Sequence, residues 1–219
     1  MRAGATGELT VVVVDPEPDR RARVQAILDA SDAVRVVEST GDAGHALARV
    51  LDEPPDALLL DAKLPDQAAL GVCWAVQQQS PATAVVLMAG PEDTATAYAA
   101  ITYGAASCLQ RADILEVCVD ALRGAIRGEY LVPPLIATRV LHDVDAYSQS
   151  SATPFGREAP LTATEREVLL GLAGGETPAE IAARHEVTAR LVNLHTGYAV
   201  AKLQRHAEAA RALATPQSA

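Results

Sequence analysis

The chain has 219 residues, with 18 basic and 28 acidic side chains and a formal net charge of −10. This length accommodates one large domain or two modest ones, each with an adequate core. The acidic balance argues against a protein that binds nucleic acid over its whole surface. No apolar run approaches the roughly 20 residues of a membrane span, and the N-terminus carries no signal-like apolar region, so we expect a soluble, cytoplasmic protein.

The three cysteines, Cys73, Cys108 and Cys118, show neither metal-ligand spacing nor a pairing pattern. They are most simply reduced, buried thiols. The five histidines are scattered, and no two of them lie at a ligand spacing on a helix. The sequence therefore predicts no structural metal and no cofactor.

Strand-like and helix-like patterns alternate through the first part of the chain. The expected strands cover residues 9–14, 34–37, 57–60, 84–88 and 106–109. A helical pattern follows each strand, the last over 114–126. Five such units with short connections predict an α/β domain with a five-stranded parallel sheet of the flavodoxin-like type and helices on both faces. Function in such a sheet lies at the carboxyl ends of the strands.

Two of these strand ends carry carboxylates, Asp15 after the first strand and Asp61 after the third. Adjacent buried carboxylates are costly unless a cation or a reaction uses them. Each aspartate could instead cap the N-terminus of the following helix. The residues alone leave both interpretations open.

The segments VVVVD, LLLDAKLPD, VVLMA and GAASCLQR, spread over residues 8–128, resemble the receiver domain of bacterial response regulators. The resemblance implies that Asp61 is the phosphoacceptor position, followed by Leu64 and Pro65 as in the family. It also implies that Asp15 is one of a pair of acids that bind Mg²⁺.

Other parts of that phosphorylation site are replaced. Pro16 stands at the second acid, and a lost oxygen ligand leaves the Mg²⁺ site of Asp15 and Asp61 weak or absent. Met88 replaces the hydroxyl residue, and Arg111 replaces a lysine whose compact ammonium it does not reproduce. The receiver-pocket positions are thus Asp15, Glu17, Met88 and Arg111, with no role assigned to Glu17.

Cys108 also replaces an aromatic residue that moves with the hydroxyl residue in the family. Phosphoryl transfer depends on positioning and on charge neutralisation by metal and cation, and both are compromised. We therefore predict an atypical receiver that serves as a dimerisation surface, a ligand-sensing domain or a docking site.

Residues 129–160 are expected to join two domains. A short helix is predicted after Pro133 and Pro134, because proline suits a helix start. Residues 143–160 are rich in Ser, Ala, Asp and Pro with little to bury, which is typical of a linker. The two domains could then move relative to each other.

Residues 161–214 carry three helix starts. Thr162 with Glu165 and Thr177 with Glu180 have capping-box spacing, and Thr188 can cap a third helix. The buried side of the third helix is expected to hold Val192, His195 or Thr196, Ala199 and Leu203. Its other side carries Arg190, Asn193, Leu194, Gly197 and Ala201. Helices so joined are typical of a helix-turn-helix, although a helical bundle without nucleic acid has the same spacing.

The run T-x-x-E-R-E-V-L-x-x-L-A-x-G, then E-I-A-x-R and V-x-x-H-x-x-x-x-x-K-L, resembles the C-terminal domain of LuxR/FixJ-type regulators. With the receiver before it, the domain order is that of the NarL/FixJ class of response regulators. The residues expected to contact DNA are Thr188, Arg190, Asn193, Leu194, Gly197, Tyr198 and Lys202.

This second domain departs from the family at Asn193, where a lysine is usual, and at Gly197. Asparagine can still pair with an adenine edge. Gly197 either lets the backbone come close to DNA or weakens the recognition of bases by this helix. From Arg157 onward the chain has seven basic and seven acidic residues, so the last domain is neutral. Because phosphate contacts dominate the affinity for DNA, we expect this domain to need dimerisation or a partner in order to bind DNA.

The sequence thus predicts a dimeric regulator of transcription that binds double-stranded DNA and is controlled independently of Asp61 phosphorylation, by dimerisation, ligand or partner binding. Two alternatives are a co-regulator that forms heterodimers with a related DNA-binding chain, and a conventional phosphorylated two-component regulator. A phosphate-ester hydrolase is disfavoured, because Lys63 stands where a second catalytic carboxylate is needed and no Gly-rich phosphate loop follows Val14. We expect no enzyme.

Overall fold

The computed structural model describes residues 8–149 and 160–214. The elements are β1 (Leu9–Val14), α1 (Pro18–Asp29), β2 (Val34–Thr40), α2 (Ala43–Asp52), β3 (Ala57–Asp61), the 3-10 turn η1 (Pro65–Gln67), α3 (Ala68–Gln79), β4 (Ala84–Ala89), η2 (Pro91–Asp93), α4 (Thr94–Thr102), β5 (Ser107–Gln110), α5 (Ile114–Ile126), α6 (Pro134–Gln149), α7 (Ala163–Ala173), α8 (Pro178–Arg184) and α9 (Ala189–Ala214). None of the helices in these ranges is both long enough and apolar enough to cross a bilayer.

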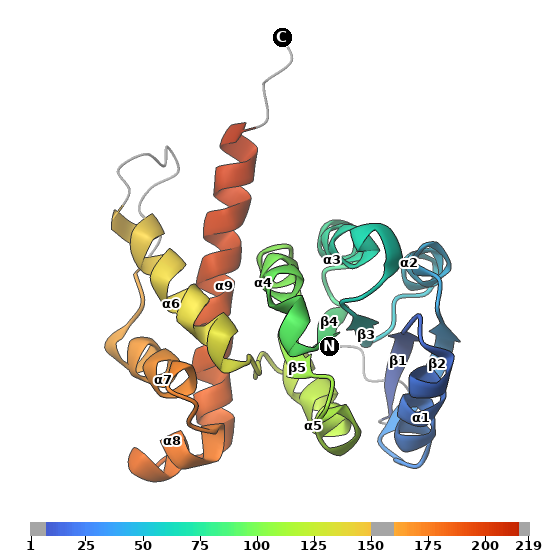
Figure 1. The fold of residues 1–219 in the computed structure, drawn as a ribbon, viewed down its shortest axis with the longest axis horizontal. Helices are drawn as coiled ribbons and strands as arrows, with labels where there is room; N and C mark the ends of the chain where they lie inside the picture. The colour runs from blue at the N-terminus through green and yellow to red at the C-terminus, as the bar shows by residue number, and fades with distance from the viewer. Residues whose placement is uncertain (1–7, 150–159, 215–219) are drawn as a thin grey trace.

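The receiver half is a five-stranded parallel sheet, as predicted, and its strands lie in the order β2-β1-β3-β4-β5. Its central strands are buried on both faces, which explains their unbroken apolar runs. Helices α1 and α5 cover one face of the sheet, and α2, α3 and α4 cover the other (Figure 1). The order places β1 beside β3, so the residues that end these two strands are neighbours.

Helix α6 corrects the predicted boundary of the linker. It runs for 16 residues to Gln149, whereas we expected a short helix and a linker from residue 143. The reason is that Val140 and Val144, one turn apart, are fully buried in the core that α6 shares with α7 and α9. Asp145 also pairs with both terminal guanidinium nitrogens of Arg166 on α7. The remainder of the predicted linker, residues 150–159, lies outside the described residues.

The three helix starts predicted for the last domain are confirmed. Thr162 and Thr177 form capping boxes with Glu165 and Glu180, and the Thr188 hydroxyl accepts a hydrogen bond from the Leu191 amide at 3.3 Å. The third helix is longer than expected. It continues without a break through residues 207–213, so that α9 spans 26 residues.

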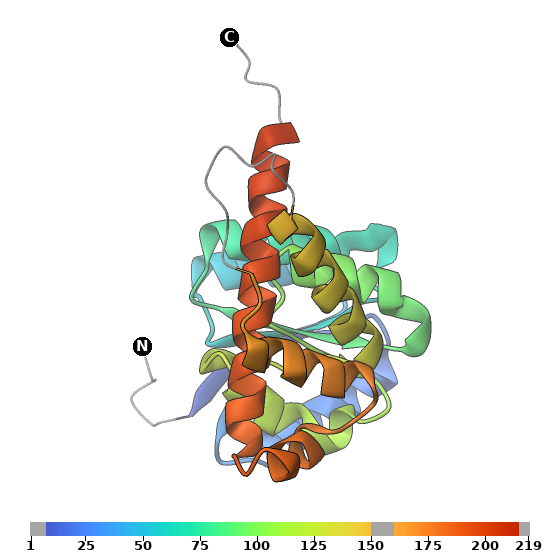
Figure 2. The same cartoon turned by 90° about the vertical axis from the view of Figure 1, so that its left-hand side faces the viewer.

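The C-terminal half of α9 packs against α4 and α6, and Figures 1 and 2 show α9 continuing beyond the short helices α7 and α8. The Gln204 amide donates to the carbonyl oxygens of Ile101 at 3.0 Å and Ala105 at 2.9 Å, at the end of α4. On α6, Asp143 accepts a hydrogen bond from the Tyr98 hydroxyl of α4. Helix α4 therefore connects the receiver to α6 and to α9.

A buried ion pair joins α7 to α9. The Lys202 ammonium lies 2.6 Å from the Glu165 carboxylate and donates to the Pro160 carbonyl at 2.8 Å. Both side chains are buried, so Lys202 is not at the surface where we expected it to contact DNA. Burial alone would raise the pKa of the Glu165 carboxyl, but the hydrogen bonds from Lys202 and Thr162 and the charge of Lys202 together outweigh it and lower this pKa.

This ion pair predicts a pH-dependent stability. Because the pKa of Glu165 in the fold lies below its ordinary value of 4.5, the pair stabilises the fold fully above that pH and loses its contribution as pH falls through the lowered pKa. At pH 7 we expect Glu165→Gln to reduce the free energy of unfolding by about 2 kcal/mol, the range of a hydrogen bond between charged groups. Urea denaturation followed by circular dichroism measures this difference.

The difference between wild type and Glu165→Gln should shrink on going from pH 7 to pH 3. Glu167→Gln, an exposed change on the same helix, is the matched control and should have little effect at either pH. An equal loss in both variants, or a Glu165→Gln deficit that does not depend on pH, would contradict the assigned role of the ion pair.

Candidate functional site

Asp15 and Asp61 meet at the carboxyl edge of the sheet, as their strand positions predict, and both are fully buried. Each accepts a hydrogen bond from a backbone amide two residues on, Asp15 from Glu17 at 2.8 Å and Asp61 from Lys63 at 2.7 Å. Helix α1 is capped by Glu17, whose carboxylate accepts from the Asp19 amide. Neither buried aspartate is therefore a helix cap, and their carboxylates need another source of neutralisation.

Arg20, in the first turn of α1, supplies part of that neutralisation. Its Nε lies 2.5 Å from Asp15 Oδ2, and its Nη2 donates to Asp15 Oδ1 at 2.7 Å and to Asp61 Oδ2 at 2.9 Å. One guanidinium thus bridges the two acids. The sequence analysis missed Arg20; the available signal was its place in the first turn of α1, two residues after Pro18, from where a long side chain can reach back towards the end of β1.

Arg111 binds Asp61 from the opposite side, at the end of β5. Its Nε and Nη2 donate to the two Asp61 oxygens at 3.1 and 3.3 Å, and the same guanidinium reaches Asp93 at 2.6 Å and Glu92 at 3.1 Å. Burial disfavours the cation, but the hydrogen bonds to Asp61 and Asp93 outweigh it and raise the pKa of Arg111. Asp61 is therefore held between two permanent cations.

The other predicted pocket residues do not join this cluster. Glu17 is exposed at the cap of α1. Met88 pairs with Asp61 in backbone register, but its side chain is fully buried in the core beneath α1 and α5. Cys108 is buried, and burial raises the pKa of its thiol to about 12. No hydroxyl stands at the position of Met88 to contact a phosphoryl group.

The donor set does not fit a magnesium ion. Mg²⁺ requires near-octahedral coordination by oxygen, and oxygens of both aspartates here already accept hydrogen bonds from Arg20. The described residues contain no group of three or more His, Cys, Asp or Glu placed to hold a metal. A divalent cation would have to displace a guanidinium from between two buried carboxylates.

The predicted DNA-binding helix has the expected buried side. Val192, Thr196, Ala199 and Leu203 are all buried against the rest of its domain. Thr188, Arg190 and Tyr198 are exposed, in accordance with a surface that could contact DNA.

The middle of α9, however, packs on the segment that leaves α5. The Tyr130 amide donates to the Asn193 carbonyl at 2.9 Å, and Arg190 Nε lies 2.6 Å from Glu129 Oε1. A methyl group at Gly197 would lie 2.1 Å from the Gly128 carbonyl oxygen. Gly197 therefore lets the two backbones touch, which gives this glycine a role against the receiver that the sequence did not suggest.

Comparison with known proteins agrees with this two-part arrangement. The response regulator receiver domain matches residues 11–118, and the family of bacterial regulatory proteins of the luxR type matches residues 159–213. The probable transcriptional regulatory protein NarL of Mycobacterium tuberculosis (strain ATCC 25618 / H37Rv) is 31% identical over 189 residues, which cover 86% of this chain and 84% of the relative. The chain belongs to the NarL-type response regulators.

Two further comparisons are more distant. The uncharacterized transcriptional regulatory protein YxjL of Bacillus subtilis (strain 168) is 24% identical over 188 residues, which cover 86% of each chain. A structure of the RcsB response regulator of Salmonella typhimurium matches with a TM-score of 0.52 and 18% identity, over 90% of this chain and 92% of that one, and supports the fold. This response regulator is thus a LuxR-family DNA-binding transcription factor and not an enzyme.

The contact at Gly197 yields a prediction. Gly197→Ala should separate α9 from the receiver segment, because the new methyl group collides with the Gly128 carbonyl. Alanine is by itself the better helix former by about 1 kcal/mol, so α9 should remain intact. We expect a larger radius of gyration in small-angle X-ray scattering, with helicity unchanged.

Gly71→Ala on α3 is the matched control, since a methyl group there would meet nothing within 4 Å. Its scattering profile should equal that of the wild type. Identical profiles for all three proteins would show that α9 does not rest on residues 128–130 in solution.

Proposed function

We propose that this response regulator controls transcription as a dimer whose DNA binding does not depend on phosphorylation of Asp61. The observation that carries the proposal is the double pairing of Asp61 with Arg20 and Arg111. A carboxylate whose lone pairs accept from two guanidinium groups is a weakened nucleophile. Phosphoryl transfer also needs a metal or equivalent cation on the incoming phosphate, and Arg20 fills the space between the acids.

The proposed DNA surface is the side of α9 that faces away from its own domain, together with the residue that precedes this helix. It comprises Thr188, Arg190, Asn193, Leu194, Gly197 and Tyr198, without the buried Lys202. Asn193 would read an adenine edge, and Leu194 would touch a thymine methyl group in the major groove. In this structure, three of these positions contact residues 128–130, the segment that follows α5: they are Arg190, Asn193 and Gly197. DNA binding therefore requires α9 to leave that segment.

A second candidate function is that of a co-regulator that pairs with a related DNA-binding chain. The neutral charge of the last domain supports it, because phosphate contacts supply much of the affinity for DNA. The fit of Gly197 to the Gly128 carbonyl supports it as well, since this glycine is explained without DNA. Recovery of specific fragments from genomic DNA of the source organism by the purified protein, at two salt concentrations and without phosphodonor, would separate a self-sufficient regulator from a co-regulator.

Phosphorylation independence is tested with Asp61→Asn. Wild type incubated with acetyl phosphate and Mg²⁺ should gain no phosphoryl mass, because Arg20 and Arg111 already occupy the Asp61 oxygens. The affinities of wild type and Asp61→Asn for a recovered fragment, measured by fluorescence anisotropy, should agree within about twofold, less than 1 kcal/mol. A phosphoryl adduct on Asp61 together with a change in affinity seen in the wild type alone would refute the proposal.

Base reading is tested with Asn193→Ala. We expect a loss of preference at one position of each half-site, worth about 1 to 3 kcal/mol, because the bidentate amide contact to adenine is removed. Selection from a randomised operator library gives the preference at every position. Leu194→Ala is the companion variant and should affect a neighbouring position. An unchanged preference in Asn193→Ala would mean that this helix does not lie in the groove as proposed.

A further inference from the structure

The end of α9 that lies farthest from the proposed DNA surface is attached to the receiver by Arg211. The guanidinium carbon of Arg211 lies 5.1 Å from the ring centroid of Trp74 on α3 and 4.6 Å from that of Tyr103 at the end of α4. The two rings are nearly perpendicular, at 86°, with their centroids 6.0 Å apart. One cation therefore contacts two aromatic rings at once, and the attraction of each ring for a cation favours this position.

Backbone carbonyl groups at and just after the C-terminal end of α4 add hydrogen bonds to this contact. Arg211 Nη2 donates to the Thr102 carbonyl at 3.1 Å. The Gln204 amide donates to the carbonyls of Ile101 and Ala105. The last carbonyls of a helix lack partners within the helix and carry partial negative charge, so they favour a cation. Gln204 and Arg211 are two helical turns apart, which places both on the side of α9 that faces α4.

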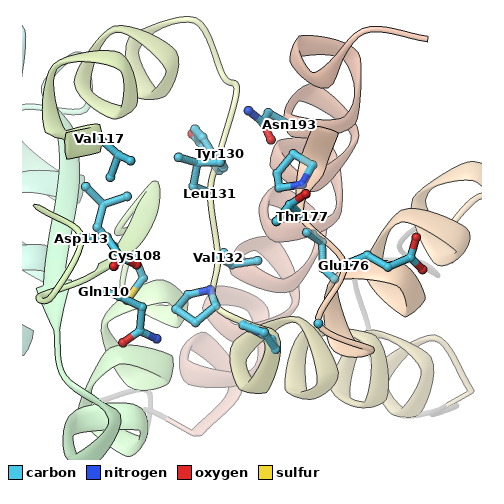
Figure 3. A pocket seen from close by; sticks show the side chains of 16 residues that line it. Cys108, Gln110, Asp113, Val117, Tyr130, Leu131, Val132, Glu176, Thr177 and Asn193 are labelled. Atoms are coloured by element: carbon cyan, nitrogen blue, oxygen red, sulfur yellow. The ribbon is translucent and has the colours of Figure 1, made fainter. Parts of the chain in front are cut away.

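The attachment of α9 is looser near the proposed DNA surface. A cavity of about 250 Å³ lies between β5 and the start of α5 on one side and the turn between α7 and α8 on the other. Figure 3 shows Tyr130, on the segment that follows α5, and Asn193, on α9, among the residues that line it. Side chains around a cavity lack part of their dispersion contacts. The ion pair of Arg190 with Glu129 adds little, because the Arg190 side chain is 69% exposed and water screens its charge.

Helix α9 is continuous over 26 residues, so its two ends move together. Gly197, which touches the Gly128 carbonyl, and Arg211 are about 21 Å apart along this helix. Moving Gly197 away from Gly128 tilts or shifts the whole helix. A guanidinium held by two rings and a carbonyl group tolerates neither change, so the contact of Arg211 opposes the departure of α9 from residues 128–130.

We propose that Arg211, Gln204, Trp74 and Tyr103 form a latch that sets the DNA affinity of this chain from outside the DNA surface. The latch holds α9 in the closed arrangement, in which residues 128–130 cover part of that surface; in the open arrangement α9 has left them. The apparent affinity for DNA is then the intrinsic affinity multiplied by the fraction of open molecules. This control of DNA binding rests on the proposed function, whereas the latch itself does not.

The effect of Arg211→Ala on DNA binding separates a latch from a direct DNA contact. Loss of a cation that contacts DNA weakens binding, because phosphate contacts are removed. Loss of the latch strengthens it, because the open fraction rises. By fluorescence anisotropy with a recovered operator fragment, we expect Arg211→Ala to bind about fivefold more tightly than wild type. Equal or weaker binding by a variant with the helicity of wild type overturns the proposal.

Arg23→Ala is the matched control for this variant. It removes the same charge from an exposed position on α1, which covers the face of the sheet opposite to α3 and α4. Its DNA affinity should equal that of wild type. A gain in affinity of the same size in Arg23→Ala would attribute the effect to net charge and would overturn the latch.

Tyr103→Leu removes one ring of the latch from the receiver side. Tyr103 lies at the end of α4, outside the proposed DNA surface, so this variant changes no DNA contact. We expect about a threefold gain in DNA affinity from Tyr103→Leu alone, and no further gain when it is added to Arg211→Ala, because both changes remove the same contact. Gains that multiply in the double variant would show that the two residues act separately and would overturn the proposal.

Trp74 is the one tryptophan of the chain and reports the state of the latch without DNA. It is 38% exposed in the closed arrangement, so the departure of α9 should make it more accessible to acrylamide. Gly197→Ala changes α9 far from Trp74 and should raise its quenching constant by about half as the open population grows. Arg23→Ala should leave the constant unchanged. Quenching in Gly197→Ala equal to that of wild type overturns the proposal.

Operator DNA should also raise the Trp74 quenching constant of wild type, because DNA binds the open arrangement. Should the chain bind no DNA, the proposed function fails, and the quenching measured in Gly197→Ala still decides whether the latch exists. Normal DNA binding without a change in Trp74 quenching would show that DNA is bound while the latch is closed, and would overturn the control of DNA binding by the latch.

Discussion

Two carboxylates buried side by side at the end of a parallel sheet must be neutralised, and in this molecule the chain itself supplies the charge. The order β2-β1-β3 places Asp15 and Asp61 on adjacent strands. Breaking a buried ion pair by removing one partner costs about 3 to 5 kcal/mol, because the remaining charge has no compensation. Arg20 and Arg111 thus stabilise the receiver fold, and the same contacts occupy the atoms that phosphoryl chemistry would need.

That edge of the sheet is connected to the helix-turn-helix through α4 and β5. Arg111 follows β5 and binds Asp93 immediately before α4, while the carbonyl groups at the other end of α4 accept from Gln204 of α9. The segment after α5 then contacts α9 again at Gly197. A single 26-residue helix therefore carries both the proposed DNA-reading surface and the contacts to the receiver. A change in the contacts between α9 and the receiver must therefore also affect the proposed DNA-reading surface, and the reverse.

The local features were predictable because they depend on neighbours in the sequence. Continuous valines and leucines gave the strands, and the capping boxes at Thr162 and Thr177 gave the starts of α7 and α8. The end of α6 was not predictable in this way. Residues 143–149 look polar and rich in small side chains, and only the position of α7 and α9 turns Val144 into a core residue.

The sequence by itself determined the parallel sheet, the starts of α7, α8 and α9 and the buried side of α9, since each follows from periodicity or capping, and the order of the two domains followed from the family resemblance. Only the tertiary structure decided which cation meets the aspartates, because Arg20 is 41 residues from Asp61 and joins it through the docking of α1. The roles of Gly197 and Lys202 were likewise decided by packing. Gly197 meets the backbone of a segment about 70 residues away and Lys202 meets Glu165, 37 residues away. Spacing within one helix carries no information about partners so distant along the chain.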